Sequence, residues 1–395
     1  MFTYPQLQRV VRIVVIVCCG TLWQECSNRL AAEIETDSNL SVVQPVCGES
    51  QLSPLSDAET PSNATGDAVG TENEVHQSDE TSEKEDHMFP KLPDWATRIK
   101  TLGGRQFWGD CFYCSGWRIQ RNVMTGHCRL LDPDDCRCAS GTEAVCRAEF
   151  VERRKKEGIP AMKGRAVVLV HGIIRSSKSF DPLEKQLASK GWNVVGFDYP
   201  STRVPIAESA RYLAEVLKSL EGIEEIDLVV HSMGGLVVRS YIQQCGEQGP
   251  DKRIRRMVML GVPNKGASMA NKFQNNVLFK TIYGPAGQEL IEGEETPVAA
   301  LPTPPFEFAV IAGGRGAERG YNPLLKGDND GTVAVESTRL PGAADFILIP
   351  SMHSFLMSNE EVIDCTERFL KSGALRKSGA KTPIPLPGNV VDSPK

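Results

Sequence analysis

The sequence contains no apolar run of about 20 residues, the length that a single helix needs to cross a membrane. The run IVVIVCCGTLW, at residues 13–23, has 11 residues and follows Arg9 and Arg12. This length and this charge are typical of a signal peptide. Small residues at Ala31 and Ala32 offer a cleavage site. We therefore interpret residues 1–32 as a signal peptide, with a membrane anchor as the alternative, and expect an exported protein: periplasmic, secreted or membrane-anchored.

Aromatic residues are absent from Glu33 to His87, and basic residues are almost absent there. Residues 31–90 carry 14 acidic side chains and one lysine. A segment of this composition cannot bury enough apolar surface to offset the conformational entropy lost on folding. We predict a disordered acidic linker over residues 33–90. The stretch PIPLPG favours a second disordered segment over residues 378–395.

A concentrated basic region is also missing. The net charge of −6 divides into +2 for the first 30 residues, −13 for residues 31–90 and +5 for the remainder. This weak positive charge does not form the footprint of a nucleic-acid-binding domain, so we expect no nucleic-acid partner. The hydrophobic content of 41% is ordinary for a globular chain, and no internal repeat is found. Neither feature predicts an oligomeric state.

A dense group of cysteines marks residues 91–150, which we interpret as a small cysteine-rich module. The six cysteines are Cys111, Cys114, Cys128, Cys136, Cys138 and Cys146. In an exported chain this density predicts three disulfides. In a reducing compartment the same residues with His127 would hold zinc, but the second C-x2-C pair of a zinc ribbon is missing. We favour disulfides and expect neither a metal nor another cofactor. Attachment to a surface or a carbohydrate through the module is a further hypothesis.

From residue 160 to residue 373, short apolar runs alternate with helical patterns. This alternation predicts an α/β domain with a mostly parallel sheet. The apolar runs do not alternate with polar residues, as expected for strands covered by helices on both faces. We expect strands at residues 166–170, 193–200, 226–230, 255–263, 308–312 and 346–349, and helices at 181–190, 206–220, 233–244 and 358–370. Ser358, three residues before Glu361, has the spacing of a capping box at the last helix.

The heptapeptide VVHSMGG, at residues 229–235, places Ser232 between an expected strand and an expected helix. A serine on such a sharp turn presents its hydroxyl above the carboxyl edge of the sheet, where it can act as a nucleophile. Gly234 and Gly235 supply the small residues that a tight turn needs. The usual pattern G-x-S-x-G is incomplete, because Val230 stands at its first position.

A nucleophilic serine needs a histidine that takes its proton and a carboxylate that orients the histidine. Of the six histidines, His353 in MHSFL is the candidate base, since His76, His87, His127, His171 and His231 have other settings. Asp330 in GDNDGTV is the candidate acid, with Asp328 as the alternative. The chain order Ser232, Asp330, His353 is the order found in α/β-hydrolases.

Backbone N–H groups must also meet the oxyanion that forms on the substrate. His171 and Gly172 follow the first strand of the domain, so the N–H of Ile173 is one expected donor. The N–H of Met233, directly after the serine, is the second. We expect the His171 side chain to be structural.

With these motifs, residues 164–370 resemble the α/β-hydrolase lipases and serine esterases, especially bacterial lipase-like and GPI-inositol-deacylase-like members. The resemblance rests on VLVHGI, VVHSMGGLVVR, GVPNKGAS, NDGTV and MHSFLM. It implies an α/β-hydrolase fold with Ser232 as nucleophile, Asp330 as acid and His353 as base. It also implies Ile173 and Met233 as oxyanion donors, and a short cap at about residues 267–305.

The resulting hypothesis is a serine hydrolase that cleaves carboxylic esters, with an ester or lipid as substrate. An acyltransferase or thioesterase using the same three residues is the alternative, because the acid–base chemistry is common to all of them. A surface protein that keeps the fold without catalysis is disfavoured, since every catalytic position is filled. Association with a membrane or cell surface is left open.

Overall fold

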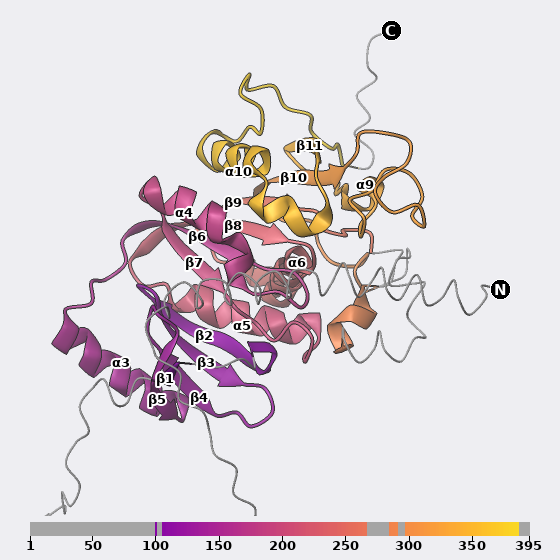
Figure 1. The fold of residues 1–395 in the computed structure, drawn as a ribbon. Helices are drawn as coiled ribbons and strands as arrows, with labels where there is room; N and C mark the ends of the chain where they lie inside the picture. Colours follow the sequence, from indigo (N-terminus) through magenta and orange to yellow (C-terminus); the bar gives the residue numbers. More distant parts are fainter. Residues whose placement is uncertain (1–98, 101–104, 267–283, 291–296, 387–395) are drawn as a thin grey trace, which may run out of the picture. The chain divides into compact units, whose positions relative to one another are not determined.

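The structure of the chain is a computed structural model that describes residues 99–100, 105–266, 284–290 and 297–386 (Figure 1). The predicted signal segment at residues 1–32 and the predicted linker at residues 33–90 lie outside the described residues. So do residues 267–283 and 291–296 of the predicted cap. In the described ranges, no helix has both the length and the apolar character needed to cross a bilayer.

Six parallel strands form the central sheet, which confirms the predicted α/β class. They are β6 (Gly164–Val170), β7 (Asn193–Phe197), β8 (Ile223–His231), β9 (Ile254–Leu260), β10 (Glu307–Gly314) and β11 (Asp345–Pro350). Their order is β11-β10-β9-β8-β6-β7, and each neighbouring pair is parallel. The carboxyl ends of all six strands therefore meet at one edge, where ligands bind in open α/β sheets.

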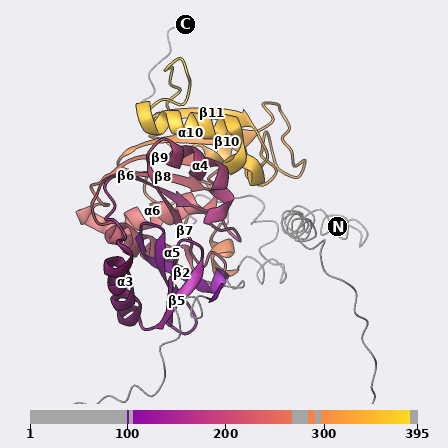
Figure 2. The same ribbon diagram turned by 60° about the vertical axis from the view of Figure 1, so that its left-hand side comes forward.

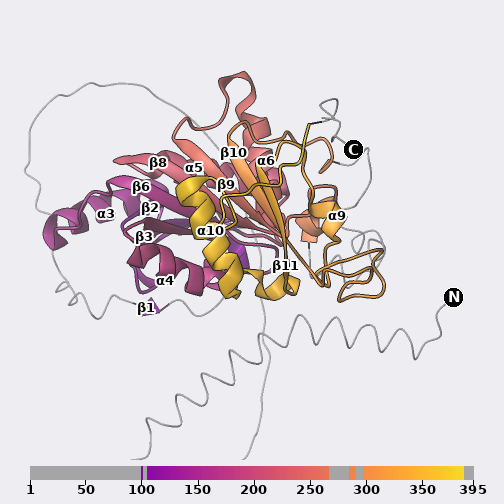
Figure 3. The same ribbon diagram turned by 90° about the horizontal axis from the view of Figure 1, so that it is seen from above.

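Helices cover both faces of this sheet (Figures 1 and 3). α4 (Asp181–Ser189) and α10 (Glu360–Ser372) lie on one face, and α5 (Ile206–Ser219) and α6 (Met233–Cys245) lie on the other. Side chains alternate between the faces along each strand. In β6, Val167 and Leu169 pack with α4 and α10, whereas Val168 and Val170 pack with α5 and α6. Burial on both faces explains the unbroken apolar runs of the sequence.

The last helix begins one residue later than the sequence indicated. The expected cap residue, Ser358, is the final residue of the 3-10 helix η4 (His353–Ser358). Asn359 is the N-cap of α10, and its side chain accepts a hydrogen bond from the N–H of Val362. Serine was the wrong choice of cap because asparagine caps a helix equally well. Asn359 stands one residue closer than Ser358 to the first helical residue, Glu360.

Antiparallel strands form the module that precedes the parallel sheet. β1 (Ile99–Lys100), β2 (Trp108–Cys114), β3 (Trp117–Asn122), β4 (Cys128–Leu131) and β5 (Cys136–Gly141) lie in the order β1-β5-β4-β3-β2. η1 (Arg105–Phe107) leads into β2. α3 (Glu143–Glu157) packs on β3, β4 and β5, so the module extends beyond the expected boundary at residue 150.

Strand β2 of the module packs against α5, as Figure 2 shows. The N–H of Tyr113 donates to Ser219 Oγ, and the Tyr113 hydroxyl donates to the carbonyl of Val194. Arg121 bonds to Glu215 of α5 through both nitrogens of its guanidinium end. The module is therefore attached to the parallel-sheet domain by buried and half-buried polar contacts.

The six cysteines of the module are thiols in the structure, so the expected disulfides are not confirmed. Five of the six are buried, and most pack in an apolar cluster with Phe112, Trp117 and Phe150. Buried thiols of this kind behave as small apolar side chains. The structure thus gives these residues a packing role.

Residues 378–386, which belong to the expected disordered tail, have a defined path beside the start of β11. The backbone of Ile384 exchanges hydrogen bonds with Gly342 and Ala343, and the N–H of Thr382 donates to Asp345 Oδ1. The prolines do not prevent this pairing, because they remove only their own N–H groups. The residues between them can still pair with a neighbouring backbone.

Candidate active site

Three side chains from separate strand ends meet at the carboxyl edge of the sheet. Ser232 follows β8, Asp330 lies in the loop after β10, and His353 follows β11. Ser232 Oγ lies 3.0 Å from His353 Nε2, and His353 Nδ1 lies 2.7 Å from Asp330 Oδ2. All three side chains are buried. The structure thus brings together the three residues that the sequence singled out, in a hydroxyl–imidazole–carboxylate line.

Ser232 sits on a strained turn between β8 and α6. Its φ of 53° and ψ of −127° lie outside the regions that residues with side chains prefer. Such conformations cost about 1–3 kcal/mol and persist where the surroundings impose them. A Cβ at Gly234 would lie 2.4 Å from the carbonyl oxygen of Val170, so only glycine fits there. The close approach of α6 to β6 fixes the turn and presents the hydroxyl.

Val230, the departure from the usual serine pattern, is a core residue of β8. Its side chain is fully buried in the core between the sheet and α5 and α6. It stands in β8 between Val170 of β6 and Met259 of β9. The branched side chain is therefore accommodated as a core residue.

The two candidate carboxylates, Asp330 and Asp328, have different tasks. Asp330 Oδ1 accepts hydrogen bonds from the N–H groups of Thr332 and Val333, at 2.9 and 2.7 Å, and Oδ2 faces His353. Asp328 instead accepts from the backbone N–H groups of Arg315, Gly316 and Asn329. Asp330 is thus the carboxylate beside the imidazole, and Asp328 shapes the loop.

The two expected oxyanion donors flank the serine. Met233 opens α6, where a first-turn N–H has no acceptor within the helix. Ile173 lies in the turn after β6. Within the part of the chain that the structure describes, neither N–H has a hydrogen-bond acceptor. Both groups therefore remain available to a negatively charged oxygen beside Ser232 Oγ.

The His171 side chain is structural, as expected. Its Nδ1 lies 2.7 Å from the carbonyl oxygen of Gly172, which requires the proton on Nδ1. Its ring stacks on Tyr199 with the ring centres 4.3 Å apart, and the Tyr199 hydroxyl donates to the His171 carbonyl. These contacts hold the start of the turn that carries Ile173.

His231 is a site residue that the sequence argument did not use. Its Nε2 donates to the carbonyl oxygen of His353, at 3.0 Å, and the two rings lie 4.6 Å apart. Burial lowers the pKa of His231 well below its usual value, and the neighbouring His353 lowers it further. A neutral His231 can thus hold the backbone of the candidate base. Its position beside the serine in the sequence was the available signal.

One group of metal-ligating side chains converges in the described residues: Cys111, Glu143 and Glu215. Arg121 donates to both carboxylates, at 2.7 to 3.0 Å. The guanidinium thus supplies the positive charge that a metal would bring. Only one of the six module cysteines takes part, so this group does not match the zinc alternative.

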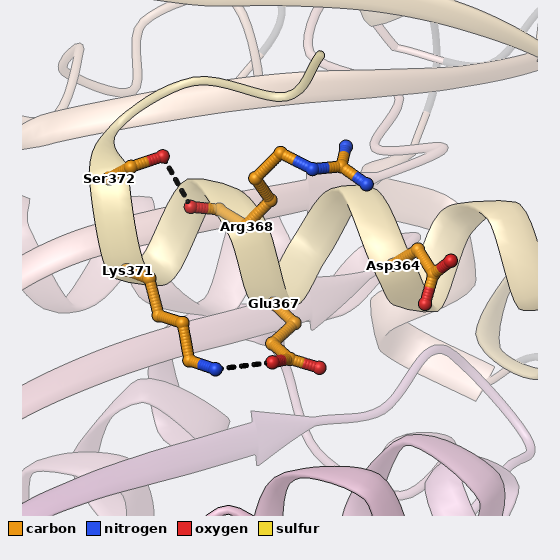
Figure 4. Close-up of a pocket in the computed structure, with 5 residues that line it drawn as sticks. All are labelled: Asp364, Glu367, Arg368, Lys371 and Ser372. Carbon is orange, nitrogen blue, oxygen red and sulfur yellow. Dashed lines mark hydrogen bonds and ion pairs between the residues drawn. The ribbon is translucent and has the colours of Figure 1, made fainter. Parts of the chain in front are cut away.

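A surface hollow on α10 contributes nothing to the three-residue line. It is lined by Asp364, Glu367, Arg368, Lys371 and Ser372 (Figure 4). Lys371 pairs with Glu367, and Ser372 Oγ donates to the carbonyl of Arg368. Asp364 accepts from Gln186 and Arg368 donates to the carbonyl of Leu375, so each of these side chains is engaged in a structural contact.

The chain matches one family model, described as a domain of unknown function (DUF7379), over residues 141–287. No curated protein matches it.

Several solved structures are similar to the chain. The mature lipase BlEst2 from Bacillus licheniformis is 20% identical with a TM-score of 0.41, over 54% of this chain and 93% of that chain. The phospholipase PlaB from Legionella pneumophila, in complex with thio-NAD, is 18% identical with a TM-score of 0.38, over 44% of each chain. A thermophilic esterase from Thermogutta terrifontis is 16% identical with a TM-score of 0.37, over 53% of this chain and 90% of that chain.

The fold itself is read from the topology of this chain. The parallel sheet has helices on both faces, and the strained serine follows its central strand β8. The carboxylate follows β10 and the histidine follows β11, the last two strands of the sheet in chain order. This is the α/β-hydrolase fold.

Proposed function

We propose that this chain is a serine hydrolase that cleaves carboxylic esters through an acyl-Ser232 intermediate. The observation that carries the proposal is the buried line from Ser232 Oγ through His353 to Asp330, with contacts of 3.0 and 2.7 Å. The N–H groups of Ile173 and Met233, which have no acceptor among the described residues, add the second element that acyl transfer needs.

In the first half of the proposed reaction, His353 Nε2 takes the proton of Ser232 as Oγ attacks the ester carbonyl. Asp330 accepts the Nδ1–H of His353, which fixes the tautomer and stabilises the imidazolium. The carbonyl oxygen becomes an oxyanion that accepts from the N–H groups of Ile173 and Met233. His353 then protonates the departing alcohol, and the acyl group remains on Ser232.

In the second half, His353 activates a water molecule that attacks the acyl carbon. The same N–H groups meet the second oxyanion, and Ser232 leaves with the proton that His353 returns. An alcohol or amine in place of water would give the acyltransferase alternative with no change in the residues.

An apolar acyl group or a lipid is the proposed substrate class. Ile174, Met352 and Phe355 are large apolar side chains that remain 37%, 37% and 52% exposed. Each lies within two residues of Ile173 or His353 in the sequence. Exposed apolar groups beside a polar site favour a substrate with an apolar body. A substrate of the GPI-inositol-deacylase kind is a narrower form of this proposal.

The test is hydrolysis of p-nitrophenyl esters of increasing chain length by the wild type and by Ser232→Ala. We expect the substitution to lower kcat by several orders of magnitude, because the nucleophile is lost. Ser240→Ala, which removes a buried hydroxyl of α6, is the matched control. Undiminished turnover by Ser232→Ala would refute the mechanism.

The chain-length series also separates the substrate classes. A rising kcat/KM toward long acyl chains would favour a lipase, and a preference for short chains would favour an esterase. Acyl transfer to an added alcohol in excess of hydrolysis would favour the acyltransferase alternative.

A further inference from the structure

The turn that carries Ile173 is strained. Residues Gly172 to Arg175 form a turn closed by a hydrogen bond from the Arg175 N–H to the Gly172 carbonyl, at 3.3 Å. Its third residue, Ile174, has a φ of 66°. A positive φ at this position normally requires glycine or asparagine, and a β-branched residue is strongly disfavoured there. The turn therefore needs outside contacts to keep its shape.

This turn lies directly against the proposed nucleophile. A Cβ at Gly172 would be 2.9 Å from Ser232 Cβ and 2.9 Å from His231 Nδ1. A small relaxation of Ile174 would thus displace the Ile173 N–H relative to Ser232. Displacements of about 1 Å can lower a catalysed rate about 100-fold.

A side chain of the cysteine-rich module holds the turn from both sides. The N–H of Ile174 donates to Ser201 Oγ, at 3.0 Å, and the Ser201 hydroxyl donates to Gln106 Oε1, at 3.0 Å. Gln106 Nε2 lies 3.4 Å from the carbonyl oxygen of Arg175, to which it donates. The strained Ile174 is therefore held on one side through Ser201 and on the other through the Arg175 carbonyl. Both contacts lead to the side-chain amide of Gln106.

Gln106 is also fixed to the loop that follows β7. Its Oε1 accepts from the N–H and the hydroxyl of Thr202, at 3.1 and 3.0 Å. Gln106 belongs to η1, whose last residue, Phe107, accepts a hydrogen bond from the N–H of Val123 within the module. The amide is thus anchored at its backbone end and at its side-chain end.

Buried polar contacts position the whole module at this loop. The N–H of Asp110 donates to the carbonyl of Asp198, and the N–H of Asp198 donates to Asp110 Oδ2. Arg118 bonds to Asp198 Oδ2, at 3.0 Å, and the N–H of Ser177 bonds to Oδ1, at 2.6 Å. Because Asp198 directly follows β7, these bonds set the distance between η1 and the loop at residues 198–202.

We propose that Gln106 is a positioning residue for the oxyanion turn, so that the cysteine-rich module is a structural part of the active site. The inference rests on the proposed function. It deepens that function by assigning to the module a role in transition-state stabilisation. Gln106 touches no reacting atom and acts through Ser201, Ile174 and Arg175.

The experiment compares Gln106→Ala with the wild type in ester hydrolysis. We expect kcat to fall about 10- to 100-fold with KM within about twofold, because the oxyanion contact strengthens only in the transition state. In a trifluoromethyl ketone, Ser232 Oγ adds to the carbonyl carbon, His353 takes the proton and the carbonyl oxygen becomes an oxyanion. The affinity for this ketone should therefore fall by the same factor as kcat/KM. If Gln106 only stabilised the fold, the ketone affinity and kcat/KM would not fall by the same factor.

Two further variants sharpen the comparison. Gln106→Glu keeps the acceptor for Ser201 and Thr202 and loses the donor to Arg175, so we expect a smaller loss than for Gln106→Ala. Ser201→Ala breaks the link to Ile174 without altering the module, and it decides the question if the Gln106 variants do not fold. Gln186→Ala, which removes an amide that joins α4 to α10, is the matched control and should keep the wild-type kcat.

The outcomes separate this inference from the proposed function. Folded Gln106→Ala and Ser201→Ala proteins with wild-type kcat and ketone affinity would overturn the inference alone, provided that Ser232→Ala is inactive. Ester hydrolysis that survives in Ser232→Ala would overturn the proposed function.

Discussion

At the scale of single residues, buried His231 connects the candidate site to the stability of the fold. Its ring is almost fully buried and neutral, and it donates from Nε2 to the backbone of His353. In the unfolded chain the same imidazole takes up a proton below a pH of about 6.5. In the folded state the pKa of His231 is lowered, so the imidazole stays unprotonated at this pH. Stability from this group is therefore complete above pH 6.5 and is lost as the pH falls below it.

The substitution His231→Gln tests this linkage, because glutamine retains an N–H donor for the His353 carbonyl and does not titrate. Below pH 6.5 we expect the free energy of unfolding of the wild type to fall more steeply than that of His231→Gln. The difference between the two slopes should be up to about 1.4 kcal/mol per pH unit. Urea unfolding at pH 7.5, 6.0 and 5.0 measures the two slopes. His127→Gln, which removes an exposed histidine, is the control. Equal slopes for the wild type and His231→Gln would contradict the assignment.

At the scale of elements, the path of residues 378–386 adds a backbone connection beside β11, an edge strand of the sheet. Asp345, the first residue of β11, is fully buried and accepts from the N–H groups of Leu375 and Thr382. A buried carboxylate that loses a donor pays a desolvation penalty. The segment therefore stabilises the end of the domain.

A truncation after Lys377 should lower the free energy of unfolding by roughly 2 kcal/mol, because several backbone hydrogen bonds and one donor to Asp345 are lost. A truncation after Leu386 removes only residues outside the described ranges and is the control. Chemical denaturation of the two proteins measures the difference. Equal midpoints would show that the segment contributes no stability.

Across the molecule, the burial of the module cysteines bears on whether they remain thiols in an exported protein. Burial raises the pKa of the Cys146 thiol to about 11, and it raises the pKa of Cys111 further. Thiolates are the reactive form, so both groups should react slowly with oxidants and alkylating agents at neutral pH. Thiols of this kind can persist even where the environment is oxidising.

Peptide mass spectrometry of the protein from its natural source, alkylated in denaturant without reductant, tests export and thiol state together. We expect a mature N-terminus near Ala32, in line with the predicted signal peptide, and alkylated Cys111 and Cys146. An intact Met1 would argue against cleavage. Disulfide-linked peptides would instead restore the expectation drawn from cysteine density.

The α/β class of the domain, the approximate positions of its parallel strands and the three residues of the candidate site could be predicted from the amino-acid sequence. Apolar runs without alternation require burial on both faces, and this requirement fixes the layers of the domain. Parallel strands bring their carboxyl ends to one edge, so Ser232, Asp330 and His353 could be placed together from their positions in the chain. These inferences succeed because they depend on local pattern and on the common direction of the strands.

Tertiary contacts were needed to show which aspartate faces the imidazole, which partners His231 and Gln106 have, and that residues 378–386 lie beside the start of β11. The sequence favoured Asp330 and kept Asp328 as the alternative, because the direction of each carboxylate follows from the loop geometry. Gln106 lies 95 positions before Ser201, and its role exists only because the module packs against α5 and the loop after β7. Contacts between distant segments depend on packing and on buried hydrogen bonds, which no local pattern records.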